Sequence, residues 1–303
     1  MTADFDDVVE EVWTTKDGTN VFDEDKFETH MISFGYGDLH YQSFTEDMTP
    51  LDMTFKETNN EFYDGTGNLV WLAALVFAHL LQLQGDYDDD SVSKKLNEIY
   101  LGERICELGC GTGVAGIAAL LARSSGNGSC SRHVLFTDND AEALELCRTN
   151  CRLNQLKEGA DYSLHLLNWG EEPYPSPSNF DTVLATDVLY DIVMIPPLMK
   201  TAASILKDSG FVLLSHVPRF CLPNDEEVML ENSKNAYDKL ESHIIEQAEK
   251  VGLFLVETVR PHKILESSLQ QSKKEASSSP LHPQLSPERL EEMHATLLTF
   301  QKR

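Results

Sequence analysis

Short apolar runs alternate with longer amphipathic stretches along most of the chain. Runs of a few apolar residues are typical of buried strands, whereas an apolar residue at every third or fourth position is typical of a helix. Strands that alternate with helices predict an α/β fold with three layers, in which helices cover both faces of a mostly parallel, Rossmann-like sheet. The predicted strands are residues 104–106, 133–137, 162–167, 180–186, 210–215, 252–259 and 295–300, and the predicted helices are 66–81, 114–122, 141–154, 194–207 and 225–251.

The last two predicted strands have no complete helix pattern between them. Parallel neighbours need a long crossover, so two strands without one pair antiparallel. The expected sheet therefore has seven strands and is mostly parallel, with an antiparallel last strand. The segment between these two strands, about residues 266–287, is rich in Ser, Gln, Lys and Pro and is predicted to be a disordered insert.

Residues 1–65 have a different pattern, and we predict that they form a β-rich extension before a main domain of residues 66–303. Residues 31–34 and 39–44 are separated by turn residues and could form a hairpin, and residues 51–55 alternate like a further strand. Such an extension could cap a bound ligand, contribute to a substrate groove, or only pack against the main domain.

The composition restricts the partners that this chain can bind. Its 303 residues are 41% hydrophobic, which is enough for a core. The formal net charge is −26. A surface that follows nucleic-acid phosphates needs clustered Lys and Arg, so no nucleic-acid partner is expected. The negative charge favours a basic partner, such as a lysine-rich protein segment, or serves solubility alone.

The number and spacing of the six cysteines are not typical of a disulfide framework. Cys147 and Cys151 lie four residues apart on a predicted helix without a second pair at zinc-finger spacing, so no metal site is expected. The acidic N-terminus does not resemble a secretory signal, and the longest apolar run, residues 69–81, is too short for a bilayer core of ~30 Å. These features predict a cytoplasmic or nuclear protein without a membrane partner, and they leave the oligomeric state open.

The central chemical signal is the stretch Glu-Leu-Gly-Cys-Gly-Thr-Gly at residues 107–113, between a predicted strand and a predicted helix. Closely spaced glycines at such a turn bring backbone N–H groups against a ligand, beside the positive end of the helix dipole. This arrangement is typical of a nucleotide-type cofactor site. Residues 111–116 also fit the dinucleotide pattern GxGxxG. However, the carboxylate of Glu107 disfavours a pyrophosphate and favours a cation, and S-adenosylmethionine carries an ammonium and a sulfonium but no phosphate.

At this loop the chain resembles motif I of the class I, seven-strand S-adenosylmethionine-dependent methyltransferases. The next predicted strand ends in Asp138-Asn139-Asp140. An acidic residue at this position is placed to accept hydrogen bonds from both ribose hydroxyls, so Asp138 is the expected ribose ligand. Asp140 is the expected N-cap of the following helix. The antiparallel closing strands also suit this fold and not a dinucleotide-binding fold.

Three further segments resemble methyltransferase family 16, a group of protein-lysine methyltransferases. They are Thr-Gly-x-x-Val-Trp at 66–71, Leu-x-Trp-Gly at 167–170 and the box Asp-Val-Leu-Tyr at 187–190. The resemblance covers about residues 66–260 and the final strand, although Leu72 replaces an Asp that family members often carry. It implies that Trp71 lies at the cofactor, that Trp169 borders the adenine, and that Asp187 and Tyr190 serve catalysis. The expected cofactor-binding residues are Trp71, Glu107, Gly109, Cys110, Gly111, Gly113, Asp138, Asn139, Trp169 and Thr186.

The resemblance implies methyl transfer from S-adenosylmethionine to a side-chain nitrogen of a protein, with lysine as the usual acceptor. Asp187 is expected to position the amine rather than to act as its base, because a nearby carboxylate favours the charged amine. Three alternatives stay open, namely methylation of histidine or another protein nitrogen, methylation of a small molecule, and a non-catalytic scaffold that binds S-adenosylmethionine. Nicotinamide-dependent reduction is disfavoured by Glu107 and the closing strand pair.

Overall fold

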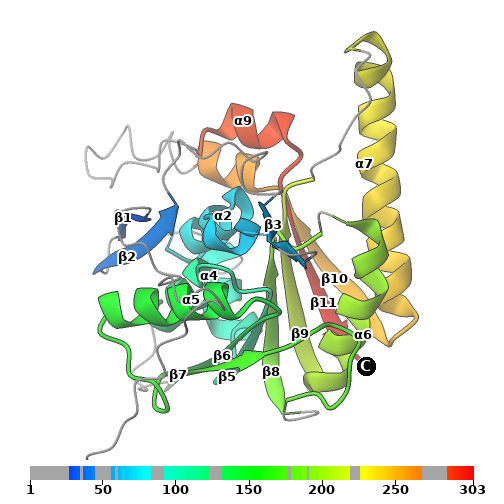
Figure 1. The fold of residues 1–303 in the computed structure, drawn as a ribbon. Helices are drawn as coiled ribbons and strands as arrows, with labels where there is room; N and C mark the ends of the chain where they lie inside the picture. Colours follow the sequence, from blue (N-terminus) through cyan, green and yellow to red (C-terminus); the bar gives the residue numbers. More distant parts are fainter. Residues whose placement is uncertain are drawn as a thin grey trace, which may run out of the picture.

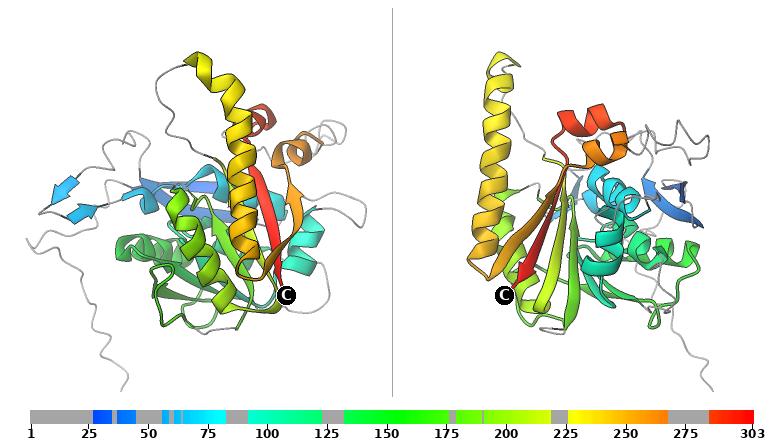
Figure 2. Two further views of the ribbon diagram at one scale, coloured as in Figure 1. Left: turned by 90° about the vertical axis from the view of Figure 1, so that its right-hand side faces the viewer. Right: turned by 180° about the vertical axis from the view of Figure 1, so that it is seen from behind.

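The computed structural model describes residues 27–34, 37–44, 56–58, 61–63, 65–82, 92–122, 132–175, 179–189, 191–218, 226–267 and 285–303. In these residues, a seven-strand sheet lies between two layers of helices, and two small antiparallel strand pairs precede it (Figure 1). The rear view in Figure 2 shows α7 on one side of the sheet and α2 and α4 on the other. The predicted three-layer α/β architecture is thus confirmed.

The sheet has the predicted mixed topology. Its strand order is β10-β11-β9-β8-β5-β6-β7. The strands from β9 to β7 pair in parallel, whereas β11 pairs antiparallel with both of its neighbours. The last strand therefore inserts between β9 and β10, as a closing hairpin requires. The strand bounds are β5 Arg104–Leu108, β6 His133–Asp138, β7 Tyr162–Leu166, β8 Phe180–Thr186, β9 Leu206–His216, β10 Leu253–Val259 and β11 Thr296–Lys302.

Each central strand is apolar on both faces because helices cover both. Successive side chains of a strand point to opposite faces. In β5, the fully buried Ile105 belongs to the core under α2 and α4, and its neighbour Cys106 belongs to the core under α6 and α7. Leu213 and Leu214 of β9 divide between the two cores in the same way. The near-continuous hydrophobic runs of the sequence follow from this double burial.

The five predicted helices lie close to their predicted ranges, with one exception. Helical residues 92–100, 261–267 and 287–292 were not predicted, and the last two segments lie between the final two strands, where the sequence shows no complete helix pattern. The helix bounds are α2 Leu72–Gln82, α3 Val92–Lys95, α4 Val114–Leu121, α5 Ala141–Leu153, α6 Ile195–Ile205, α7 Glu226–Glu249 and α9 Pro287–Glu292, with short 3-10 turns at η2 Gly65–Asn68 and η4 Ile192–Met194 and a π-turn at η3 Leu96–Tyr100. Residues 261–267 are also helical. None of the helices within the described ranges combines the length and hydrophobicity needed to cross a membrane.

The exception is the helix predicted to begin at residue 66. The α-helix begins only at Leu72, and the carbonyl of Trp71 accepts its first hydrogen bonds, from the N–H groups of Ala74 and Leu75. The preceding turn η2 passes against the glycine-rich loop, where the carbonyl oxygen of Gly67 would lie 2.9 Å from a Cβ on Gly111. A continuous helix would not follow this path, so the tertiary contact overrides the apolar pattern.

The predicted N-terminal hairpin is confirmed, and it is attached to the main domain. Strands β1 Phe27–Phe34 and β2 Gly37–Phe44 pair antiparallel, and the side chains of Ile32, Leu39 and Tyr41 belong to the same core as α2 and α4. A second small pair, β3 Lys56–Thr58 and β4 Glu61–Tyr63, follows. The strand predicted at residues 51–55 lies outside the described residues, as does most of the predicted insert, residues 268–284.

Two asparagines of α5 hold the hairpin. The side-chain amide of Asn154 exchanges hydrogen bonds with the backbone of His40, at 2.9 Å to its N–H and 2.6 Å to its carbonyl. Asn150 does the same with Gln42, at 2.6 Å and 3.1 Å. Each side-chain amide thus accepts from the N–H and donates to the carbonyl of one strand residue, as the backbone of a neighbouring strand would. The hairpin is therefore anchored by specific polar contacts in addition to its apolar side chains.

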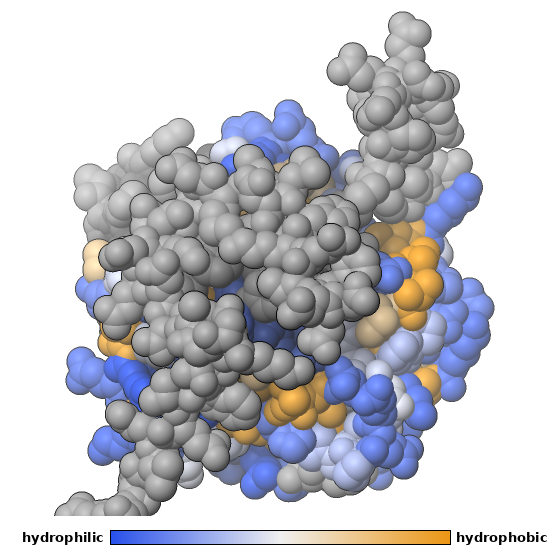
Figure 3. Space-filling model, viewed as in Figure 1, coloured by the Kyte–Doolittle hydropathy of each residue, from blue (hydrophilic) through white to orange (hydrophobic). Residues whose placement is uncertain are grey.

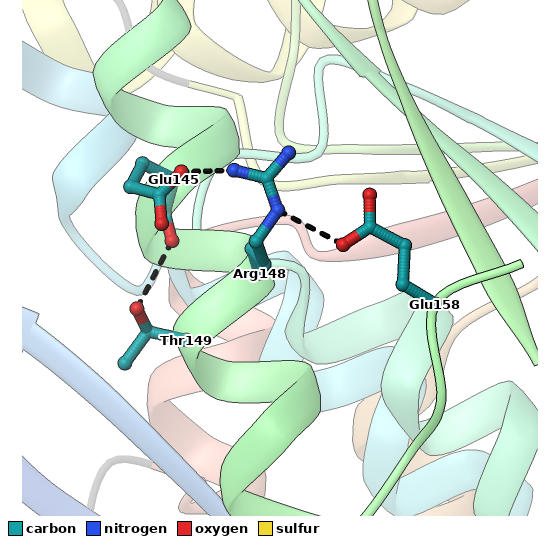
Figure 4. A network of polar contacts seen from close by, with 4 residues as sticks. All are labelled: Glu145, Arg148, Thr149 and Glu158. Carbon is teal, nitrogen blue, oxygen red and sulfur yellow. Dashed lines mark hydrogen bonds and ion pairs between the residues drawn. The ribbon is translucent and has the colours of Figure 1, made fainter. Parts of the chain in front are cut away.

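The opposite face of α5 carries charged residues. Figure 4 shows Arg148 between Glu145, one turn earlier on the helix, and Glu158, in the segment after it. The Nε of Arg148 lies 3.1 Å from a carboxylate oxygen of Glu158. Such partly exposed ion pairs stabilise a fold only slightly. They show that α5 is amphipathic, which directs its asparagines inward.

Candidate active site

A cavity lies at the carboxyl ends of the parallel strands, where open α/β sheets bind ligands. Its volume is about 560 Å³. It opens where β5, β6 and β8 end, beside the start of α6. The lining residues are Gly67, Leu69, Trp71, Ala74, Gly109, Cys110, Gly111, Thr112, Asp138, Asn139, Asp140, Ala141, Leu167, Asn168, Trp169, Glu171, Thr186, Asp187, Val188 and Met194.

The glycine-rich loop forms one wall of this cavity. Gly109, Gly111 and Gly113 all have positive φ angles, of 69°, 49° and 77°, which side chains other than glycine rarely adopt. A Cβ on Gly109 would also lie 2.8 Å from Val188 and 3.0 Å from the ring of Trp169. The glycines therefore allow the loop to bend and to meet the segments after β7 and β8. Gly113 does not line the cavity; it is the N-cap of α4.

Asp138 lies where the sequence predicts a ribose ligand. It ends β6 and is almost buried, and its two carboxylate oxygens accept hydrogen bonds from the N–H groups of Gly111, at 2.9 Å, and Asp140, at 3.1 Å. Burial raises the pKa of Asp138 to about 6, although these hydrogen bonds oppose the shift. Each oxygen keeps a further lone pair for a ligand hydroxyl. Asp140 caps α5 as predicted, accepting from the N–H of Glu142 at 2.8 Å.

Glu107, which the sequence analysis expects among the cofactor-binding residues, is not among the residues that line this cavity. The side chain is fully buried beneath the loop, and its Oε2 accepts a hydrogen bond from the N–H of Gly116 at 2.9 Å. Gly116 leaves the space for it, because a Cβ there would lie 2.4 Å from that oxygen. Burial is the main reason that the pKa of Glu107 rises to about 8, and the nearby Asp138 raises it further. Glu107 thus supports the start of α4.

The other expected cofactor residues come together around the cavity. Trp71, just before α2, and Trp169, after β7, both line the cavity, and Trp169 packs against Gly109. Cys110 of the loop lines the cavity, and burial raises the pKa of its thiol to about 12, which favours the protonated, less reactive form. Asn139 is exposed at the rim and Thr186 lines the cavity at the end of β8. Among the residues expected at the cofactor, only Glu107 and Gly113 lie outside the lining of this cavity.

Asp187 follows β8 in an unusual backbone conformation. Its φ angle is +59°, and its N–H donates to the carbonyl of Ser215 at 2.9 Å. Its Oδ2 accepts a hydrogen bond from the N–H of Ala73 at 3.3 Å, in the first turn of α2. Non-glycine residues at such angles cost free energy and occur preferentially at functional sites. The strain and the hydrogen bonds fix the carboxylate of Asp187 at the cavity wall. Tyr190, its expected catalytic partner, lies outside the described residues.

Several lining residues were not predicted from the sequence, among them Gly67, Glu171 and Met194. Gly67 lies in the segment that was expected to be helical, so its backbone contact with the loop was missed. Met194 directly precedes α6, which begins at Ile195. Because α6 follows the carboxyl end of β8, the predicted order of strands and helices was enough to place Met194 near the cavity. Glu171 follows the Leu-x-Trp-Gly segment, and no sequence pattern marks it as a residue of a binding site.

The charges of the cavity have one sign. Its ionisable carboxylates are Asp138, Asp140, Glu171 and Asp187, and no Lys, Arg or His is among the described residues that line it. A pyrophosphate would be repelled here, whereas a ligand with cationic groups is favoured. Within the same part of the chain, no group of three or more His, Cys, Asp or Glu residues is arranged to hold a metal ion.

Comparison with known proteins agrees with this geometry. The family model described as lysine methyltransferase, methyltransferase family 16, matches residues 50–236, more than half of the chain. The chain belongs to this lysine methyltransferase family. Its relatives include the protein N-lysine methyltransferase METTL21A of Xenopus tropicalis, 30% identical over 162 residues, which are 53% of this chain and 65% of the relative. The EEF1A lysine methyltransferase 3 of Mus musculus is 28% identical over 149 residues, 49% of this chain and 57% of the relative.

The chain spans about three fifths of the length of these curated relatives. The matched residues 50–236 contain the glycine-rich loop, Asp138, Trp169 and Asp187, and so include most of the cavity wall. The lysine methyltransferase family uses S-adenosylmethionine. The chemistry of the described cavity suits this cofactor, because its lining combines carboxylates with the rings of Trp71 and Trp169 and contains no basic side chain.

Proposed function

We propose that this chain transfers a methyl group from S-adenosylmethionine to a lysine side chain of a protein. The observation that carries the proposal is the cavity whose ionisable residues, in the described chain, are all acidic. It suits a cationic cofactor and attracts a protonated amine. Membership of the lysine methyltransferase family and the activities of the named relatives support the same reaction.

The cofactor, when bound, supplies an electrophilic methyl group on its sulfonium. We propose that Asp138 accepts hydrogen bonds from the ribose hydroxyls and that Trp169 stacks on the adenine through its ring face. Trp71 and Val188 provide apolar surface that keeps water from the reacting centre. The loop glycines let the backbone approach the cofactor closely.

Asp187 is proposed to orient the acceptor amine. A lysine with a pKa near 10.4 is protonated in water and has to release one proton before its nitrogen can attack. The carboxylate of Asp187 draws the ammonium into the cavity and holds the nitrogen after the proton leaves to solvent. The nitrogen then forms a bond to the methyl carbon as the bond from that carbon to sulfur breaks, which leaves S-adenosylhomocysteine. Most of the acceleration comes from this alignment.

We also propose a basic protein segment as acceptor and a reducing compartment, the cytoplasm or the nucleus. The net charge of −26 supports the first. The second is supported by the free thiols of the four described cysteines, Cys106, Cys110, Cys147 and Cys151, three of which lie close together under the loop.

Calorimetry followed by labelled-methyl transfer tests the proposed function. The purified chain should bind S-adenosylmethionine and S-adenosylhomocysteine but not NAD. With S-adenosylmethionine labelled at its methyl group, it should label a cell lysate in a band that protease treatment removes. Binding without any protein label would contradict protein methylation, and binding of NAD alone would contradict the assignment of the cavity.

A further inference from the structure

Two exposed aliphatic side chains lie next to the cavity. Ile192 and Val193 are 56% and 64% exposed, and the next residue, Met194, lines the cavity. Among the large hydrophobic side chains that the described residues expose, these two are the only sequence neighbours. On the face that Figure 3 shows, the surface of the described residues is mostly hydrophilic, with several separate hydrophobic patches. An exposed pair of this kind marks a contact surface more often than single exposed side chains do.

The turn that carries this pair is fixed in place. Asp191 caps it, since its Oδ1 accepts from the N–H of Val193 at 3.0 Å and its carbonyl accepts from the N–H of Met194 at 3.1 Å. Ile195, at the start of α6, is fully buried, and two prolines follow it. The turn is therefore anchored on both sides. Ile192 and Val193 cannot fold back into the core without breaking the cap and displacing Ile195.

The surroundings of the pair are acidic. Asp191 is exposed beside it, and Glu171 is exposed at the rim of the same cavity, where it accepts a hydrogen bond from Asn168 at 3.1 Å. Since the described cavity wall contains carboxylates and no basic group, the mouth combines an apolar contact with negative charge. A partner that fits this surface carries an apolar side chain and positive charge.

We propose that Ile192 and Val193 form an aliphatic lip on which the acceptor protein docks. The occupant is a protein segment in which an apolar side chain lies near the target amine, among basic residues. The apolar side chain covers the lip, and the amine enters the cavity towards Asp187. This inference rests on the proposed function, because it assigns the position of the acceptor of that reaction. Nucleic acid and anionic lipid do not fit, since the acidic rim repels their phosphates.

Substitution of the lip tests the docking role. In Ile192→Ser/Val193→Ser, the initial rate of labelling is measured over a dilution series of the lysate that supplies the labelled band. The apparent KM for this acceptor should rise about ten-fold, because two aliphatic side chains no longer contribute to the contact. The rate at saturating acceptor, the affinity for S-adenosylmethionine and the Tm should be unchanged.

The matched control is Ile99→Ser. Ile99 is 57% exposed, as Ile192 is, but it lies in η3, which precedes β5 and so lies at the opposite end of the sheet from the cavity. This variant should label the acceptor as the wild type does. An unchanged KM in the lip variant, or an equal rise in Ile99→Ser, would overturn the proposal.

A crosslink tests the contact directly. Val193 is replaced by the photoreactive amino acid benzoylphenylalanine, and Ile99 is replaced likewise as the control. The protein crosslinked from position 193, and not from position 99, should be the one that carries the labelled methyl group. A crosslink to lipid, or to unlabelled protein only, would contradict the lip. Absence of any labelled protein with the wild type would contradict the proposed function itself, whereas a labelled band with an unaffected lip variant would contradict only this inference.

Discussion

The carboxyl group of Asp138 accepts hydrogen bonds from two backbone N–H groups, and at moderately acidic pH much of it is protonated. Burial raises its pKa from 3.8 to about 6. Hydroxyl donors bind the ionised form better, so a cofactor that donates two ribose hydroxyls lowers this pKa. By linkage, binding below pH 6 requires the release of a proton. If Asp138 binds the ribose as proposed, its raised pKa sets a lower pH limit for cofactor binding.

We expect the affinity for S-adenosylmethionine to fall as the pH is lowered through 6, by at most about ten-fold per pH unit, as one released proton allows. Calorimetry between pH 5 and pH 8 measures this dependence. In Asp138→Asn, binding should be weaker and should lose the change near pH 6. Glu107→Gln serves as the control, since Glu107 is a buried carboxyl that does not line the cavity, and this variant should keep the change near pH 6. An Asp138→Asn variant that keeps the full pH dependence would refute the role of Asp138.

The second residue-scale prediction concerns Asp187. Asn tolerates positive φ and can still accept from the N–H of Ala73, so Asp187→Asn removes the charge with little change of backbone. Cofactor affinity should stay within about two-fold of the wild type, and turnover should fall by about 10²-fold, as for the loss of a positioning group. Single-turnover transfer of labelled methyl measures it. Unchanged turnover would remove Asp187 from the mechanism.

At the scale of elements, the N-terminal hairpin and the glycine-rich loop share one side chain. Asn150 of α5 is fully buried, and its amide donates to the carbonyl of Gln42 at 3.1 Å and to the carbonyl of Thr112 at 2.9 Å. Asn154, one turn later, bonds to the hairpin at His40 and to the carbonyl of Asn150, and within the described residues it does not bond to the loop. The described part of the extension is thus coupled to the cofactor wall through Asn150.

We expect Asn150→Leu to destabilise the fold by about 1–3 kcal/mol, because it leaves buried backbone groups without partners, and to weaken cofactor binding several-fold. Asn154→Leu should also lower the free energy of unfolding but leave cofactor affinity unchanged. Denaturant unfolding and calorimetry measure the two effects. Equal affinities in both variants would show that the contact with Thr112 does not support the loop.

Elements with a strong periodic pattern were predictable, and those shaped by a tertiary contact were not. All seven strands of the sheet coincide with apolar runs in the sequence, and the central strands are buried on both faces, as at Ile105 and Cys106. The late start of α2 was not predictable, since it depends on Gly67 meeting the loop at Gly111, which no local pattern encodes. Likewise, Glu107 has the residue type of a cation ligand, but in the folded chain its side chain lies beneath the loop. There it accepts a hydrogen bond from the N–H of Gly116, a contact that the sequence alone does not reveal.

At the scale of the whole molecule, net charge and cavity charge have the same sign. A formal charge of −26 around an acidic cavity attracts basic segments over a distance that salt controls. The Debye length falls from ~30 Å at 0.01 M to ~3 Å at 1 M ionic strength. Docking of a basic acceptor therefore depends on salt more than the binding of a small enclosed cofactor does.

Raising the salt concentration over this range should raise the apparent KM for the protein acceptor at least several-fold, with a smaller change in the affinity for S-adenosylmethionine. Rates of labelling at limiting and saturating lysate separate the two effects. A labelling rate that does not change with salt would indicate an acceptor that is not basic.

The most direct test of the central claim is the identity of the methylated residue. The protein band labelled with methyl groups from S-adenosylmethionine is hydrolysed completely, and the labelled amino acid is compared with standards by mass spectrometry. We predict that the label is recovered as methylated lysine, and that Asp187→Asn greatly reduces it. Recovery as methylated histidine, or in a small molecule that survives protease treatment, would contradict the account.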